Sequence, residues 1–456
     1  MAMAIANDKV EEFRKGIRGP VILPGDPDFD EVRQVWNGMI DRKPPMIVRC
    51  TGNADVIAAV GFARENGLPV SVRGGGHSAA GSAVSDDALM IDLSLMNGVH
   101  VDPKNRTARA QGGAKWGDFD RETQVYGLAS TGGVVSTTGV GGLTLGGGIG
   151  WLMGKHGLSV DNMLSADVVL ASGELVTASE TENPDLFWAL RGGSGNFGIV
   201  TSFEFRVHPV GPMVTGGLAA WPLSMARECL DFYAEFTSKA SDEMGSFMGF
   251  TGAPDGSGNL IVVFIGCHTG TPEAAAAELK AVKEFGPPIL DLLGPIPYTA
   301  MQSILDNPAR AQVYWKSTFL KEFTPETRDV IAQSARNLPT PLSMLLLEHF
   351  HGAMSKVPAD ATAFSDRDAA FNVAIVGTTL DPAENDQCRT WARQVTEDLK
   401  PFSTGGVYVN YLGVGDDESR VPEAFGGNYQ RLQELKQKYD PQNLFRANQN
   451  IKPAGT

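Results

Sequence analysis

Three clusters of glycine in the first half of the chain combine residue types and spacing that could do chemistry. The first cluster follows a strand-like segment at residues 68–73, and its residues are Arg73, Gly74, Gly75, Gly76, His77 and Ser78. The second contains Gly139, Gly141, Gly142, Gly146, Gly147 and Gly148, and the third covers residues 192–198. Glycines present backbone N–H groups with no Cβ in the way, and successive N–H groups form a nest that binds anions. Tight turns would explain any single cluster, but all three together predict a long, flat, phosphate-bearing ligand wrapped by backbone.

The third cluster contains a G-x-G-x-x-G pattern, from Gly193 to Gly198. A dinucleotide-binding fingerprint of the Rossmann type follows a strand and opens a helix, so that the pyrophosphate meets the helix N-terminus. Here the order is reversed, because residues 186–190 have the pattern of a helix and residues 199–207 that of a strand. The pattern therefore argues against a nicotinamide-dependent dehydrogenase.

The segments around the clusters are expected to form two kinds of structure. Residues 46–75 have the pattern of a β-α-β unit, followed by strands near 89–93, 107–111, 167–177 and 199–207 and a helix at 116–126. After Pro212 the glycine clusters thin out. The expected helices there are 227–240, 272–285, 386–399 and 429–439, and the expected strands are 260–265, 342–350 and 371–376. Strands and helices in this mixed order predict an α+β fold with an antiparallel sheet.

Composition excludes several classes of protein. The chain has 456 residues, a net charge of −15 and 53 glycines, where an average usage of about 7% would give about 32. A chain this acidic repels phosphate backbones, so no nucleic-acid partner is expected. The four cysteines, at positions 50, 229, 267 and 388, are too far apart in sequence to indicate a zinc cluster or a redox pair. We expect buried apolar cysteines and no metal site.

One uncharged stretch, at residues 123–154, is long enough to cross a bilayer. Eleven of its 32 residues are glycine, and each glycine costs about 1 kcal/mol in a helix interior. Residues 1–16 acquire charges from Asp8 onward and lack the apolar core of a signal peptide. We therefore expect no membrane partner and a soluble, cytoplasmic protein.

Five stretches together resemble the berberine-bridge-enzyme-like FAD-linked oxidases, which belong to the vanillyl-alcohol oxidase, or PCMH-type, flavoprotein superfamily. These stretches are residues 73–78, 139–151, 184–201, 408–411 and 439–451. The resemblance implies a PCMH-type FAD-binding domain of two subdomains, formed by residues 1–212 and completed by residues 405–456. It also implies a substrate-binding domain at residues 213–404, with an antiparallel sheet over the flavin.

The resemblance further implies that FAD is bonded covalently to His77 through the flavin 8α-methyl group; otherwise His77 is an ordinary capped loop histidine. Besides the first two clusters, the cofactor-binding positions that it implies are Val135, Leu145, Asn196, Gly198, Ile199, Val200 and Asn448. Many members carry a second link through a cysteine four residues before the second cluster, but here that position is Val135. A cysteinyl link is thus excluded, and the chain joins the members with a single histidyl link. We expect a lower flavin potential for that reason.

A flavin oxidase of this kind transfers a substrate hydride to flavin N5 while a nearby base takes a proton, and dioxygen then reoxidises the flavin to give hydrogen peroxide. The resemblance places the Tyr-Val-Asn-Tyr segment beside the flavin. If residues 406–412 form a strand, alternation puts Tyr408 and Asn410 on one face and Tyr411 on the other. Tyr408 and Asn410 are therefore the first candidates for substrate or ring contacts, with Tyr411 beside them.

A second candidate source of a base is the strand expected at residues 342–351. Alternation places His349 and His351 on one face and Glu348 on the other. Either face could supply the base; the alternative is a polar strand end that faces solvent. Tyr314 is a weaker candidate.

The leading functional prediction is an oxidase that acts on a CH–OH or CH–NH group of a small, fairly apolar molecule, with dioxygen as acceptor. One alternative is a dehydrogenase of the same fold that passes electrons to another acceptor. Another is a flavin-binding protein without turnover. The sparse charge in the expected sheet strands favours an apolar substrate site, and a hydrophobic ring system would suit it.

Overall fold

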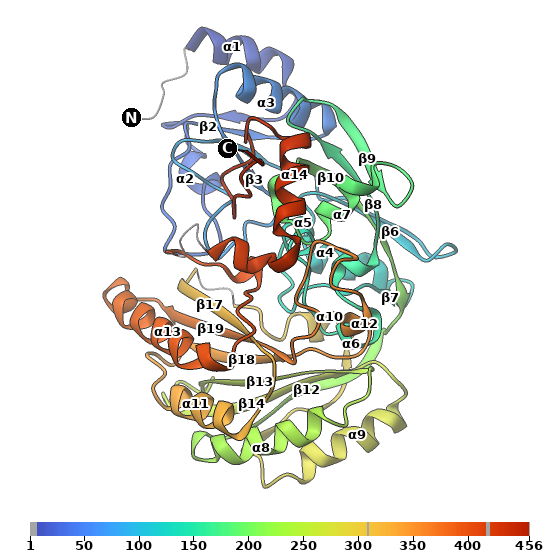
Figure 1. The fold of residues 1–456 in the computed structure, drawn as a ribbon, viewed down its shortest axis with the longest axis vertical. Coiled ribbons are helices and arrows are strands. Elements are labelled where there is room, and N and C mark those ends of the chain that lie inside the picture. The colour runs from blue at the N-terminus through green and yellow to red at the C-terminus, as the bar shows by residue number, and fades with distance from the viewer. Residues whose placement is uncertain (1–6, 308–309, 416–419, 456) are drawn as a thin grey trace.

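The computed structural model describes residues 7–307, 310–415 and 420–455, and its elements form an upper and a lower half (Figure 1). A four-stranded sheet in the upper half has the order β1-β2-β4-β3, with β2 and β3 parallel to β4. Its strands are β1 (Val21–Ile22), β2 (Met46–Arg49), β3 (Val70–Arg73) and β4 (Leu89–Asp92). The helices that accompany it are α1 (Asn7–Gly16), α2 (Phe29–Val32) and α3 (Asn53–Glu65). The expected β-α-β unit is confirmed as β2-α3-β3, and the first glycine cluster leaves the end of β3.

A second sheet of the upper half is antiparallel and has the order β5-β6-β10-β8-β9. Its strands are β5 (Val99–Asp102), β6 (Thr107–Gln111), β8 (Met163–Val169), β9 (Leu175–Ser179) and β10 (Ile199–Arg206). The surrounding helices are α4 (Trp116–Gln124), α5 (Val140–Leu145), α6 (Met153–His156), α7 (Pro184–Leu190) and, from the end of the chain, α14 (Tyr429–Tyr439). A short pair links β7 (Leu128–Ala129) to β11 (His208–Pro209). Helix α7 precedes the third glycine cluster and β10 follows it, so the predicted order opposite to a Rossmann fingerprint is confirmed.

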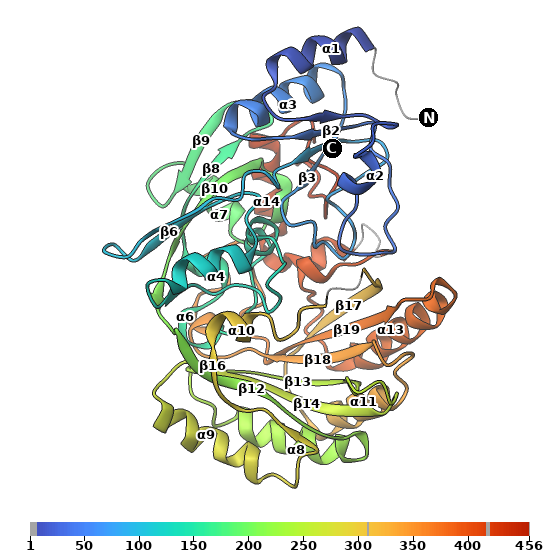
Figure 2. The same ribbon diagram turned by 180° about the vertical axis from the view of Figure 1, so that it is seen from behind.

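The lower half is one eight-stranded antiparallel sheet of order β15-β12-β14-β13-β18-β19-β17, with β16 paired to β12. Its strands are β12 (Met213–Pro222), β13 (Met244–Gly252), β14 (Leu260–His268), β15 (Leu290–Asp291), β16 (Gly294–Pro297), β17 (Gln312–Leu320), β18 (Met344–His349) and β19 (Phe371–Thr379). Its helices are α8 (Ala226–Thr237), α9 (Pro272–Glu284), α10 (Tyr298–Gln302), α11 (Pro325–Arg336), α12 (Ala353–Lys356) and α13 (Asn385–Leu399). Figures 1 and 2 show α8, α9 and α11 on the side of the sheet away from the upper half. The α+β class is confirmed, and the domain limits at residues 212 and 405 stay a prediction.

Two local expectations are corrected by the structure. Residues 406–412 do not form a strand: Val409–Tyr411 is a 3-10 helix, labelled η6. The helix expected at 116–126 ends at Gln124.

The uncharged stretch at 123–154 contains short helices and glycine turns, with Gly147 and Gly148 at positive φ. In the part of the chain that the structure describes, no helix has the length and apolarity needed to span a membrane. The four cysteines are buried and unpaired, as predicted.

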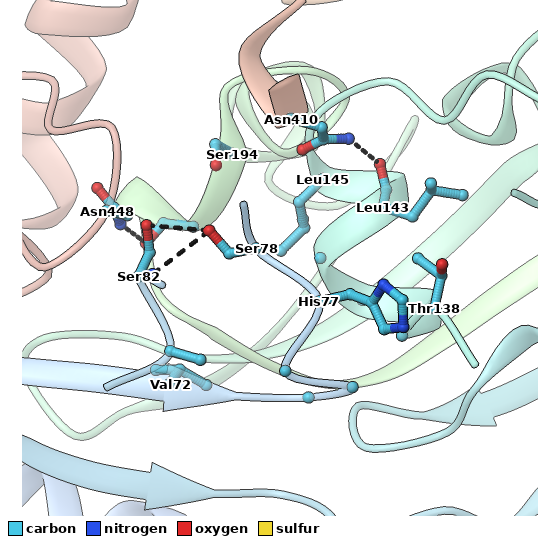
Figure 3. Close-up of a pocket in the computed structure, with 18 of the residues that line it drawn as sticks. Val72, His77, Ser78, Ser82, Thr138, Leu143, Leu145, Ser194, Asn410 and Asn448 are labelled. Atoms are coloured by element: carbon cyan, nitrogen blue, oxygen red, sulfur yellow. Dashed lines mark hydrogen bonds between the residues drawn. The ribbon is translucent and has the colours of Figure 1, made fainter. Parts of the chain in front are cut away.

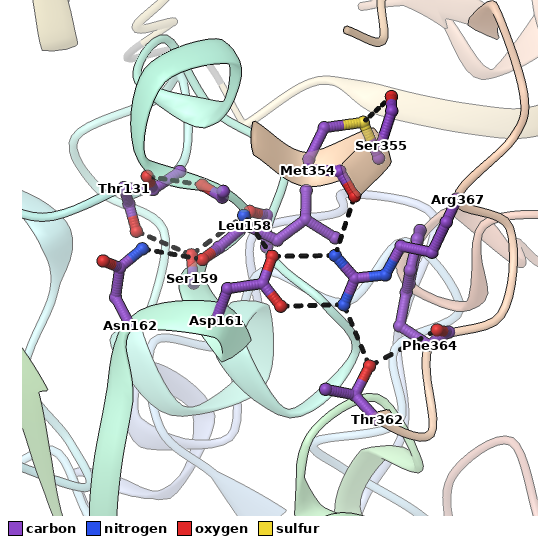
Figure 4. A network of polar contacts seen from close by, with 12 residues as sticks. Thr131, Leu158, Ser159, Asp161, Asn162, Met354, Ser355, Thr362, Phe364 and Arg367 are labelled. Atoms are coloured by element: carbon purple, nitrogen blue, oxygen red, sulfur yellow. Dashed lines mark hydrogen bonds and ion pairs between the residues drawn. The ribbon is translucent and has the colours of Figure 1, made fainter. Parts of the chain in front are cut away.

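A buried ion pair joins the two halves (Figure 4). Asp161, in the 3-10 helix η1 (Ser159–Asn162), accepts hydrogen bonds of 2.7 and 2.8 Å from the two terminal nitrogens of Arg367. The guanidinium also donates to the carbonyl of Met354 and the hydroxyl of Thr362. Arg367 is 3% exposed and Asp161 10%. A bidentate pair out of water is directional, so it holds the loop around Phe364 in one position against the glycine turns of the upper half.

Candidate active site

A cavity of about 270 Å³ lies among the three glycine clusters. Figure 3 shows Ser78, Ser82 and Asn448 on one side of it, and His77 and Thr138 on another. Over the residues that the structure describes, its lining contains no Asp, Glu, Lys or Arg. An anionic ligand in this cavity would therefore depend on neutral donors, namely backbone N–H groups and the hydroxyl and amide side chains of the lining.

The first and second clusters touch through their backbones. A Cβ at Gly75 would overlap the backbone of Gly139, and a Cβ at Gly74 would lie 2.9 Å from the carbonyl oxygen of Gly112. Gly76 has a φ of +71°, a conformation that residues with a Cβ rarely adopt. Glycine is thus required here, because any side chain would push apart the two loops that frame the cavity.

His77 lines the cavity at the end of the first cluster. Its Nε2 lies 2.8 Å from the Thr137 hydroxyl, and its ring stacks on Trp36 with centroids 4.8 Å apart and planes 22° apart. Removal from water lowers the pKa of His77 to about 4, so the imidazole is neutral at pH 7. A neutral imidazole carries a lone pair on one nitrogen, which is the state that a nucleophile needs.

Arg73 does not line the cavity, unlike the rest of its cluster, and its assignment to the cofactor stays a prediction. Its Nε donates to Asp92 at 2.9 Å, and its terminal nitrogens bond Asp92 and the carbonyls of Val32 and Gln34. Arg73 therefore holds the strand end and the nearby loop in place. Ser78 does line the cavity, and its hydroxyl bonds that of Ser82.

Tyr408 and Asn410 clamp the second glycine cluster. The Tyr408 hydroxyl accepts hydrogen bonds from the Gly148 backbone N–H at 2.9 Å and from Asn410 Nδ2 at 2.8 Å. Asn410 also donates to the carbonyl of Leu143 at 3.0 Å. Burial raises the pKa of Tyr408 to about 12. Both side chains line the cavity, but their polar atoms face the loop. Of this cluster and its neighbours, the lining contains Val135, Gly139, Gly141, Gly142 and Leu145, whereas Gly146, Gly147 and Gly148 form the turn behind Tyr408.

Tyr411 shares a side with Tyr408, because residues three apart eclipse in a 3-10 helix. The two rings are 4.8 Å apart, which corrects the expectation of opposite faces. The Tyr411 hydroxyl donates to Glu348 Oε1 at 2.8 Å, and Asn372 Nδ2 donates to Glu348 Oε2 at 2.6 Å. Glu348 is fully buried, so the alternative of a solvent-facing strand end is wrong. Burial raises its pKa from 4.5 to about 7.

His349 and His351 lie on the opposite side of the sheet from Glu348, as strand alternation predicts for His349. Their rings stack at 4.3 Å, and His349 packs on Phe371 in the core between the sheet and its helices. Neither lines the cavity, and a role for either as the base stays a prediction. Tyr314 also points away, since its hydroxyl accepts a 3.0 Å hydrogen bond from Arg393.

The third cluster and the end of the chain close the cavity together. Asn196 does not line it; its Nδ2 donates to the carbonyl of Gln449 and its Oδ1 accepts from the Ile451 N–H. Asn448 lines the cavity and donates to the carbonyl of Gly195, while its Oδ1 is buried and has no protein partner among the described residues. The lining also contains Gly198, Ile199 and Val200. An orphaned acceptor beside glycine backbone suits a ligand with hydroxyl or N–H donors and phosphates.

Sequence reasoning missed an aromatic row along one wall of the cavity. Ring centroids are 6.2 Å apart between Trp36 and Trp315, and 4.6 Å apart between Trp315 and Tyr411. Strand alternation in β17 would have placed Trp315 on the face opposite Tyr314. Trp36 lies in an irregular loop, and no periodic signal marks it. Sequence reasoning also missed Thr137 and Asn372 as site residues. Each contributes through a hydrogen bond to a residue distant in sequence, Thr137 to His77 and Asn372 to Glu348.

The fold and the cavity are those expected of a protein that binds a large phosphate-bearing cofactor between the two sheets of the upper half and above the sheet of the lower half. Residues 44–179 match the FAD binding domain family, and residues 407–452 match the berberine and berberine-like family. An FAD-linked oxidoreductase of Dictyostelium discoideum is 30% identical over 98% of this chain and 98% of its own length. The (R)-6-hydroxynicotine oxidase of Paenarthrobacter nicotinovorans is 29% identical over 96% and 98%.

Solved structures show the same relationship. The chain superposes on 6-hydroxy-D-nicotine oxidase of Arthrobacter nicotinovorans with a TM-score of 0.86 at 28% identity, covering 96% of this chain and 98% of the other. It superposes on xylooligosaccharide oxidase of Myceliophthora thermophila, in complex with xylobiose, with a TM-score of 0.86 at 27% identity, covering 98% and 100%. The chain therefore belongs to the berberine-bridge-enzyme-like FAD-linked oxidoreductases, and FAD is its cofactor.

Proposed function

We propose that this chain is an FAD-dependent oxidase of a small, uncharged molecule that carries a CH–OH or CH–NH group beside a flat hydrophobic ring. When bound, FAD supplies an acceptor for the substrate hydride and a donor of the two electrons to dioxygen, which becomes hydrogen peroxide. Several relatives are named oxidases, of hydroxynicotine and of xylooligosaccharides. The FAD-binding residues proposed are the cavity-lining glycines of the three clusters with His77, Ser78 and Asn448.

The hydrogen bond between Tyr411 and Glu348 carries the proposal. Tyr411 lines the cavity and Glu348 lies behind it, so the phenol is the group that a substrate could touch. Burial raises the pKa of Tyr411 well above its usual value, so the phenol keeps its proton in the resting state. As the substrate O–H or N–H loses its proton to the Tyr411 oxygen, the phenolic proton moves to Glu348 Oε1. Asn372 donates to the other carboxylate oxygen, Oε2, and leaves Oε1 as the acceptor of this proton.

The substrate class follows from the wall next to Tyr411. Trp36, Trp315 and Tyr411 present aromatic surface, and no charged side chain of the described residues lines the cavity. A carboxylate or phosphate on the substrate would find no cationic side chain on this wall to pair with, and a buried charge without a partner is costly. A flat ring gains contact area and favourable ring packing against the same wall. A hydroxyl-rich sugar finds few side-chain partners there, which separates this proposal from the sugar oxidases in the family.

The experiment is anaerobic mixing of the purified flavoprotein with two matched panels, followed by loss of flavin absorbance. One panel contains aromatic secondary alcohols and amines, and the other contains free hexoses and short oligosaccharides. We expect flavin reduction by the first panel only, with dioxygen consumed and hydrogen peroxide formed on admission of air. Reduction by sugars alone would refute the substrate class. Reduction without dioxygen uptake would refute the oxidase and favour a dehydrogenase, and reduction by nothing would favour a binding protein.

A further inference from the structure

One contact of His77 occupies one nitrogen of its ring and leaves the other free. Nε2 lies 2.8 Å from the hydroxyl of Thr137. Nδ1 has no hydrogen-bond partner among the residues that the structure describes, and His77 lines the cavity. Trp36 stacks on the ring, and the backbone N–H of Trp36 donates to the carbonyl of Gly76, next to His77. The ring is thus held both on one face and at Nε2.

Thr137 is itself held on both sides. The backbone N–H of Ser136 donates to Asp306 at 2.7 Å, and the carbonyl of Ser136 accepts from Gly117 at 2.8 Å. The carbonyl of Thr138 accepts from Trp116 at 2.9 Å. These bonds fix the backbone on both sides of Thr137 without help from His77. Besides burial, the charges that act on His77 are Lys115, which lowers its pKa, and Asp306, which raises it.

We propose that Thr137 is the positioning residue that makes Nδ1 of His77 the nitrogen that bonds covalently to FAD; this rests on the histidyl link implied above. With the Thr137 hydroxyl as acceptor, Nε2 carries the imidazole proton and Nδ1 carries the lone pair. After the link forms, Nε2 has lost its proton and needs a donor. A hydroxyl can serve in turn as acceptor and donor, and the exposed Thr137 can exchange its proton with water.

Covalent attachment of FAD to His77 is a two-electron oxidation. A C–N bond forms between His77 Nδ1 and the 8α carbon, and one C–H bond of that methyl group and the N–H bond at Nε2 are broken. Two protons and two electrons are released in total. Dioxygen takes them to give hydrogen peroxide, so attachment needs dioxygen and no other oxidant.

The test follows covalent attachment in apoprotein mixed with FAD in air, with acid-precipitated flavin measured against time for wild type, Thr137→Val, Thr137→Ser and His77→Ala. We expect Thr137→Val to attach flavin roughly tenfold more slowly, the change that the loss of one ordinary hydrogen bond to the ring supports. Thr137→Ser keeps the hydroxyl and should attach at close to the wild-type rate. His77→Ala should attach none. Equilibrium binding of FAD before attachment should be equal in wild type, Thr137→Val and Thr137→Ser, which controls for folding and for the cavity.

A second measurement is the position of the bond, read from the isolated flavin peptide. Wild type and Thr137→Ser should carry it at Nδ1, and a fraction of Thr137→Val should carry it at Nε2. Equal rates and a single Nδ1 product in Thr137→Val would overturn the role of Thr137 while leaving the histidyl link intact. Tightly bound flavin that is wholly released by acid in wild type would overturn the link, and the role of Thr137 with it, without touching the oxidase assignment.

Discussion

Replacement of Glu348 by glutamine separates a catalytic role from a structural one, because the two roles predict opposite changes in stability. The amide has the shape of the carboxyl group and can still accept from Asn372, but it cannot take the proton of Tyr411. Loss of a positioned proton acceptor reduces a rate by about 10²–10⁴-fold. We therefore expect Glu348→Gln to slow flavin reduction by substrate by about that factor, with bound FAD unchanged.

The raised pKa of Glu348 gives the pH dependence and its sign. Below about 7 the carboxyl is protonated and cannot accept the Tyr411 proton. Flavin reduction in wild type should therefore rise with pH through about 7 and then level off, and Glu348→Gln should lack this rise. Anaerobic stopped-flow measurements across that range provide the assay. A variant with the wild-type rate and the same pH profile would refute the role of Glu348.

The same pKa predicts the stability of the variant. An acid whose pKa is higher in the folded state stabilises the fold at low pH, and this contribution is lost as pH rises from the unfolded to the folded pKa. The rise from 4.5 to about 7 corresponds to about 3 kcal/mol, at roughly 1.4 kcal/mol per pKa unit. Glu348→Gln should thus be more stable than wild type above pH 7, by up to that amount, and equally stable near pH 4. Denaturant unfolding at the two pH values tests this. A variant less stable at both would show that the carboxylate is a structural partner.

Three further predictions concern the cofactor and the fold. Gly75→Ala should sharply reduce flavin content, because its Cβ would overlap Gly139; a normal absorbance ratio of flavin to protein would contradict the backbone cradle. Arg367→Met leaves the Asp161 carboxylate buried without its partner and should lower the free energy of unfolding by about 3–5 kcal/mol; a urea titration showing under 1 kcal/mol, well below that range, would mean that water replaces the guanidinium. With no cysteinyl link, the flavin midpoint potential should lie below that of relatives with two links, and dye-equilibration titration would show a value as high as theirs if the reasoning is wrong.

Strand alternation predicted the direction of side chains correctly where the strands are regular. It placed Glu348 and His349 on opposite faces of β18. The sheet face with Glu348 meets the upper half, and the face with His349 meets the helices. Alternation failed at residues 406–412, where a 3-10 turn brings Tyr408 and Tyr411 to the same side. Short irregular segments have no period, so their side-chain directions depend on what they pack against.

The sequence by itself determined the features that are local. The three glycine clusters, the order of helix and strand around the third, the α+β class and the lack of a cysteine at position 135 all follow from residue type and short-range spacing. Only the tertiary structure decided which distant residues meet: Tyr411 with Glu348, Thr137 with His77, and Trp36 with Trp315. These pairs are separated by 60 or more residues, and long-range contacts are set by how the sheets pack, which no local pattern encodes.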